Sequence, residues 1–157
     1  MAKFKFQLES VEKVRTQKEQ KMLEILSESQ REYLSRIQDK RDLLSKKQNA
    51  FEKKNELVSR DASINEIRLS EDFITGLNAR ILKADQAIVR ARRFLDQAMR
   101  NYINARKERM MIDRLKERAH EEFKLEQNRL EQRKLDDLIT MRARLNHGPI
   151  ESEEEIA

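Results

Sequence analysis

The sequence predicts an all-α protein, a long two-helix antiparallel coiled-coil hairpin with a longer C-terminal helix. Hydrophobic residues make up 38% of the 157 residues and charged residues 40%, with only two glycines and one proline. A compact domain of this length needs more apolar side chains to bury and more turn residues to reverse its chain. The 34 Lys and Arg residues are interspersed with the 29 Asp and Glu residues, which is typical of long helices exposed to solvent.

The first helix is expected over about residues 8–58, with a sparse apolar stripe. The stripe comprises Tyr33, Ile37, Leu44, Phe51 and Val58, joined by Leu43, Ala50 and Leu57. Lys40, Lys47 and Lys54 occupy positions that a tight seam fills with leucine. A lysine stem contributes less than a buried leucine, so we expect this helix to pair weakly.

A turn is expected between about residues 59 and 70, where two serines could begin the second helix. Ser63 and Glu66 fit a capping box, in which each side chain accepts a backbone N–H of the other residue. Ser70 is a rival N-cap, followed by acidic residues that favour a first helical turn. The sequence does not choose between them, and we expect the second helix over about residues 70–145.

The second helix carries a heptad pattern over about six repeats, which indicates a coiled coil. The seam residues are Ile67, Ile74, Ile81, Ala84, Ile88, Ala91, Leu95, Ala98, Tyr102 and Ala105. Arg109 and Lys116 then interrupt the seam. Because this helix is the longer one, its residues beyond about 118 are expected to have no partner within the chain.

The chain between residues 1 and 145 is therefore expected to be a single domain, followed by an acidic disordered tail at 146–157. Asn146–Pro149 combines glycine and proline, which end helices, and four glutamates follow. The chain has no cysteine, no apolar run of about 18 residues and no apolar core of a signal peptide near its start. We expect a cytosolic protein without disulfides or membrane insertion.

No catalytic, cofactor-binding or metal-binding residue is expected, and we interpret the chain as not an enzyme. Neither His120 nor His147 belongs to an HExxH pattern, and two glycines cannot form a glycine-rich phosphate loop. The basic stretch from Arg80 to Arg118 keeps nucleic-acid binding as an alternative, although its basic residues spread around the helix without aromatic side chains between them. A generic coiled-coil scaffold or dimerisation protein is the other alternative.

Three segments resemble the FliJ family of flagellar type III export proteins. They are the opening residues 4–11, residues 105–118, and the charged run of residues 126–137. The last is similar to the Glu-Gln-Lys…Asp-Glu signature of that family, with Asp136-Asp137 in place of the usual Asp-Glu.

The resemblance implies a monomeric antiparallel hairpin, similar to the central stalk subunit of rotary ATPases, that serves flagellum assembly and motility. Members sit in the hexameric export ATPase, contact the cytosolic domain of the membrane export gate, and bind the export chaperones of late substrates. The implied location is the bacterial cytoplasm, peripheral to the inner membrane.

The resemblance also implies two sets of binding residues. The gate-binding residues would be Leu44, Phe51, Phe73 and Leu77. Lys40, Lys47, Arg80 and Ala84 stand at neighbouring family positions but differ in residue type, so no role is carried over to them. The ATPase-ring residues would be Phe123, Leu130, Glu131, Gln132, Lys134, Asp136 and Asp137.

Overall fold

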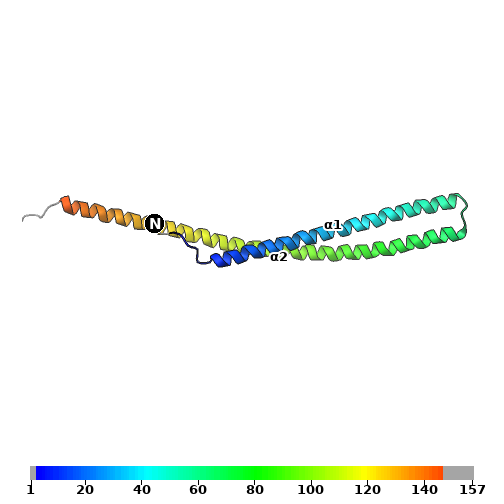
Figure 1. The fold of residues 1–157 in the computed structure, drawn as a ribbon, viewed down its shortest axis with the longest axis horizontal. Coiled ribbons are helices and arrows are strands. Elements are labelled where there is room, and N and C mark those ends of the chain that lie inside the picture. Colours follow the sequence, from blue (N-terminus) through cyan, green and yellow to red (C-terminus); the bar gives the residue numbers. More distant parts are fainter. Residues whose placement is uncertain (1–2, 147–157) are drawn as a thin grey trace, which may run out of the picture. The chain divides into compact units, whose positions relative to one another are not determined.

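The structure, a computed structural model, describes residues 3–146 (Figure 1). Within this range it contains two helices, α1 (Glu9–Ser59) and α2 (Ile64–Asn146), and no strand. The predicted fold class, an all-α helical hairpin with the longer helix second, is confirmed. Apart from Asn146, the predicted acidic tail lies outside the described residues.

The chain divides into two compact units, and both helices contribute to each of them. The hairpin unit comprises Lys13–Arg109, which includes the turn. The described part of the terminal unit comprises residues 3–12 and 110–146. The expectation of a single domain over residues 1–145 stays a prediction.

The end of α1 forms a Schellman motif that reverses the chain. The Ala62 N–H donates to the carbonyl oxygen of Leu57 at 3.1 Å, and the Asp61 N–H donates to that of Val58 at 3.3 Å. Asp61 adopts the left-handed conformation that this motif requires, with φ of 52°. These bonds satisfy carbonyl groups that the end of a helix otherwise leaves without a partner.

The start of α2 is capped by Ser63, one of the two N-caps that fit the sequence. The Ser63 N–H donates to Glu66 Oε2 at 3.0 Å, and the Glu66 N–H donates to Ser63 Oγ at 3.4 Å. The helix therefore begins at Ile64, and the expected start near residue 70 is wrong. The reason is that the Ser63 box satisfies two backbone donors at once, whereas Ser70 lies inside the helix.

In the hairpin unit α1 and α2 lie side by side and run in opposite directions (Figure 1). Lys40 pairs with Asp85 at 2.6 Å, and Lys54 pairs with Glu71 at 2.8 Å. Residues later in α1 thus pair with residues earlier in α2, as in antiparallel helices. An apolar cluster of Ala50, Ile74 and Leu77, with Leu43 packed against it, forms the core near the turn.

The face of α1 that meets α2 contains only part of the predicted stripe. Leu43, Ala50 and Leu57 are buried or half-buried, whereas Leu44 and Phe51 are exposed. Lys40, Lys47 and Lys54 lie half-buried on the same inner face as Leu43. Two of these lysines reach acidic residues of α2, so their stems can pack while the ammonium groups stay paired.

All ten predicted seam residues of α2 are buried or half-buried. The buried members at one heptad position are Ala91, Ala98 and Ala105, spaced by seven residues. Alanine leaves little side-chain volume, so it allows the backbones of two helices to approach closely.

Candidate partner-binding surfaces

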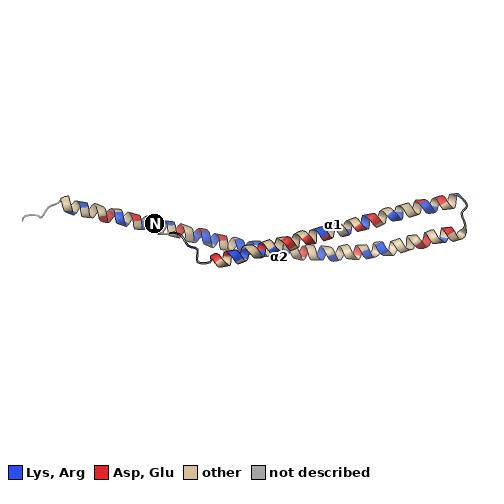
Figure 2. Ribbon diagram, viewed as in Figure 1, with Lys and Arg blue, Asp and Glu red and all other residues tan. Residues whose placement is uncertain are grey.

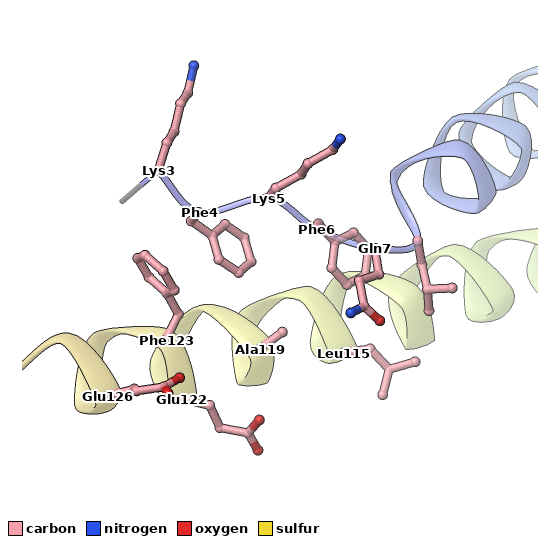
Figure 3. Close-up of a pocket in the computed structure, with 11 residues that line it drawn as sticks. Lys3, Phe4, Lys5, Phe6, Gln7, Leu115, Ala119, Glu122, Phe123 and Glu126 are labelled. Atoms are coloured by element: carbon pink, nitrogen blue, oxygen red, sulfur yellow. The ribbon is translucent and has the colours of Figure 1, made fainter. Parts of the chain in front are cut away.

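In the terminal unit, residues 3–8 precede α1 and lie along α2 (Figure 3). We call this segment the N-terminal strap. Phe4 and Phe6 point toward α2, while Lys3 and Lys5 point away from it (Figure 3). An extended chain directs successive side chains to opposite sides, which explains the alternation. Phe6 is thereby only 9% exposed.

The strap contacts α2 through its aromatic rings. The ring of Phe4 meets that of His120 edge-on, with centroids 5.0 Å apart and planes at 77°. It also lies 5.6 Å from the ring of Phe123. Lys116 Nζ stands 6.0 Å from the ring centroid of Phe6, within the range of a cation–π contact.

The expectation that α2 has no partner within the chain beyond about residue 118 is therefore wrong for its next turns. Phe4 covers Phe123, and α2 residues as far as Glu126 line the space beneath the strap. An extended segment advances about 3.3 Å per residue and a helix 1.5 Å, so the strap spans roughly twice as many helical residues as its own length. Phe4 and Phe6 were missed as contact residues, although the Phe-Lys-Phe alternation is visible in the sequence.

A cavity of about 610 Å³ lies between the strap and α2 (Figure 3). The α2 residues that line it include Leu115, Ala119 and Phe123, together with the carboxylates of Glu122 and Glu126. A second cavity of about 370 Å³ adjoins Phe4. Both are grooves open to solvent, so solvent reaches the edges of the contact between the strap and the helix.

An ion pair joins the first turn of α1 to α2 in the same unit. Lys116 Nζ donates to Glu12 Oε1 at 2.8 Å and to Oε2 at 2.9 Å. The hydrogen bond to Glu12 raises the pKa of Lys116 above its ordinary value of 10.5, against the opposing effect of burial. Lys116 is one of the two residues that interrupt the heptad seam, and its charge is neutralised there.

The part of α2 after the strap is exposed along residues 128–146. Its exposed large apolar side chains are Leu130, Leu135, Leu138, Ile139, Met141 and Leu145. Of the predicted ATPase-ring residues, Phe123 is half-buried beneath Phe4. The other six are exposed.

In the hairpin unit, three of the four predicted gate-binding residues are exposed near the turn. Leu44 is 44% exposed, Phe51 39% and Phe73 57%. Leu77 is only 2% exposed, because it belongs to the apolar core with Ala50. A side chain buried to this extent is not available to a partner, so the structure removes Leu77 from the predicted set.

Lysines border this exposed apolar surface. Lys47 Nζ lies 5.8 Å from the ring centroid of Phe51. Lys54 donates to Glu71 Oε1 at 2.8 Å, and this hydrogen bond lowers the pKa of Glu71 below its ordinary value of 4.5. Arg80 is exposed and Ala84 is half-buried.

Ion pairs flank the buried alanines of the seam at the end of the hairpin unit that lies away from the turn. Glu108 accepts hydrogen bonds from Arg15 and, at 2.9 Å, from Lys18, and Glu19 pairs with Arg109. The hydrogen bond from Lys18 is the largest cause that lowers the pKa of Glu108, with a further contribution from the charge of Arg15. Arg109 is the first residue that interrupts the heptad seam, and the structure gives it an acidic partner.

Basic and acidic residues are interspersed along both helices (Figure 2).

Within residues 3–146, no group of three or more His, Cys, Asp or Glu side chains is arranged to hold a metal ion. Neither helix in that range has a stretch apolar enough to cross a membrane.

The chain pairs two long helices and leaves large apolar side chains exposed on both units. This arrangement is typical of coiled-coil proteins that bind partners. Residues 4–148 match the family model described as Flagellar FliJ protein. The match covers most of the chain, which therefore belongs to the Flagellar FliJ protein family. Neither the curated proteins nor the solved structures gave a match. The chain is accordingly a component of the flagellar export apparatus, in a family that is not catalytic.

Proposed function

We propose that the chain acts as a stalk in the ring of the hexameric export ATPase, contacts the cytosolic domain of the membrane export gate, and escorts the export chaperones of late substrates. It does so in the bacterial cytoplasm, at the inner membrane. The observation that carries this proposal is the row of exposed apolar side chains on α2 between Leu130 and Leu145, in a chain of the flagellar export family. Such a row favours a protein partner.

The terminal unit supplies the surface for the ATPase ring. Leu130 provides an apolar contact. The residues that follow it in sequence carry both positive and negative charges around this contact. An apolar centre with a polar rim is the usual arrangement of a protein interface. The charged residues of this rim are Glu131, Lys134, Asp136 and Asp137, with Gln132 among them.

The turn region of the hairpin unit supplies the surface for the export gate. Leu44, Phe51 and Phe73 are exposed there, and aromatic side chains contribute strongly at the centres of interfaces. Leu77 supports this surface from the core and does not itself touch the gate.

The ring contact is tested by titrating the export ATPase with the unchanged chain and with the Leu130→Ala variant. We expect the chain to stimulate hexamer assembly and ATP hydrolysis, and the variant to do so about tenfold less effectively, as for a central interface residue. Leu82→Ala is the control, because Leu82 is also an exposed leucine of α2 but lies in the other unit. Unchanged assembly and hydrolysis with the unchanged chain would contradict the proposal.

The gate contact is tested with Phe73→Ala and the isolated cytosolic domain of the gate. Phe73 is 57% exposed, so its truncation should weaken binding while helicity and thermal stability stay nearly the same. Leu82→Ala again serves as the control for losing an exposed apolar side chain. Equal binding by Phe73→Ala and the unchanged chain would exclude Phe73 from the gate surface.

A further inference from the structure

The α2 face beneath the N-terminal strap is built to receive aromatic side chains. Leu115, Ala119 and Phe123 follow one another at intervals of four residues, so they lie on one side of the helix. Figure 3 shows the rings of Phe4 and Phe6 directed toward α2 near Ala119 and Phe123, with Leu115 at the margin of the face. The chain itself therefore demonstrates which side chains this face accepts.

The strap is held to α2 by ring contacts of Phe4 and by the burial of Phe6. Its carbonyl groups at Phe6 and Leu8 accept hydrogen bonds from the first turn of α1, whereas its contacts with α2 are aromatic. Grooves of about 610 Å³ and 370 Å³ that are open to solvent adjoin Phe4. A bulkier segment would fill this space better than the strap does.

The carboxylates around the face favour a basic partner. Glu117, Glu122 and Glu126 line the two cavities, whereas Lys3 and Lys5 of the strap point away from α2. A partner segment that replaced the strap would therefore combine aromatic side chains with lysine or arginine.

We propose that the α2 face of Leu115, Ala119 and Phe123 is a docking surface for an aromatic and basic segment of the export ATPase, and that the N-terminal strap occupies this surface until the ATPase displaces it. This inference rests on the proposed function, in which the terminal unit binds the ATPase ring. It adds an intramolecular competitor to that contact. Phe123 joins the ring contact only after Phe4 has left it.

A strap that competes with the partner lowers the apparent affinity by the fraction of molecules in which the face is open. Removing its two rings should therefore raise the affinity of the full chain for the ATPase. Titration of the ATPase with the Phe4→Ala, Phe6→Ala double variant should show an affinity on the order of tenfold higher than that of the unchanged chain. The matched control is the Lys3→Ala, Lys5→Ala double variant, which shortens the strap side chains that point away from α2 and should not raise the affinity.

Displacement of the strap can be observed directly, because the chain has no cysteine. A spin label on Lys5→Cys reports only the strap, and the unlabelled ATPase is silent in electron paramagnetic resonance. The label should be restrained in the free chain and should become mobile when the ATPase is added.

The outcomes separate this inference from the proposed function. If the unchanged chain does not bind the ATPase, the proposed function fails and the inference fails with it. If it binds, but Phe4→Ala, Phe6→Ala leaves the affinity equal or lower, the strap does not compete and only the inference is overturned. A label that is mobile in the free chain, or that stays restrained in the complex, also overturns it.

Discussion

The two ends of the hairpin unit hold the same pair of helices together by different means. Near the turn, Ile74 and Leu77 form an apolar cluster with Ala50. At the opposite end, Glu108 binds Arg15 and Lys18, and Glu19 binds Arg109. The helices thus bury larger apolar side chains near the turn, and at the opposite end they bury only alanines, Ala98 and Ala105, beside the ion pairs.

This difference determines which end should open first. Burial of apolar side chains is the main favourable term in folding, whereas an ion pair open to solvent contributes about 0–1 kcal/mol and a half-buried one must offset lost hydration. We therefore expect the turn end to be the stable part of the hairpin unit and the ionic end to open more often. Regions with few buried apolar contacts open locally at low free energy.

The strongest test of this comparison is to remove the apolar core at the turn. Leu77→Ala deletes most of a side chain that is 2% exposed, and core truncations of this kind cost about 2–4 kcal/mol. The free energy of unfolding, measured by urea titration with circular dichroism, should fall by that amount.

Phe73→Ala is the matched control for this change. It removes a larger side chain four residues away on the same helix, but that side chain is mostly exposed, so the loss should stay below about 1 kcal/mol. If the two variants lose the same stability, the apolar cluster does not hold the turn end.

The sequence predicted most of this fold because heptad spacing reports directly on burial. The ten seam residues of α2 all lie buried or half-buried, and both candidate N-caps were visible before Ser63 proved to be the one used. The predicted stripe of α1 was too wide. Tyr33, Ile37, Leu43, Ala50 and Leu57 are buried or half-buried as predicted, whereas Leu44, Phe51 and Val58 are exposed.

The candidate surfaces were harder to predict than the helices. Leu77 lies seven residues before the seam residue Ala84, so its heptad position favoured the core while the resemblance implied a gate contact, and its packing against Ala50 shows that it is core. The strap was missed because helical periodicity says nothing about a short extended segment. Its contacts join Phe4 to Phe123, which are far apart in sequence.

A smaller loss is expected from the ionic end. Glu19→Gln removes the charged partner of Arg109, whose side chain is 28% exposed, and should lower the free energy of unfolding by about 1 kcal/mol. Glu24→Gln makes the same change at an exposed position of α1 and serves as the control. A loss for Glu19→Gln as large as that for Leu77→Ala would remove the contrast between the two ends.

The turn end can also be strengthened without touching the interface between the helices. A Cβ added at Gly76 would meet no atom within 4 Å, so the glycine serves no close approach of the helices. Gly76→Ala should therefore raise the free energy of unfolding by up to about 1 kcal/mol through helix propensity alone. A decrease in the same urea titration would mean that Gly76 has a structural role in α2.

The smallest effect is a pH dependence that both ends share. The pKa of Glu71 is lowered by Lys54 near the turn, and that of Glu108 is lowered mainly by Lys18 at the ionic end. A carboxyl whose pKa is lowered by folding stabilises the folded state above its ordinary value of 4.5. That contribution disappears as the pH falls through the lowered pKa.

The melting temperature should thus decrease slightly between pH 5 and more acidic conditions. Glu71→Gln and Glu108→Gln should each make this decrease shallower. If neither substitution alters the slope, these two ion pairs do not contribute to stability at either end.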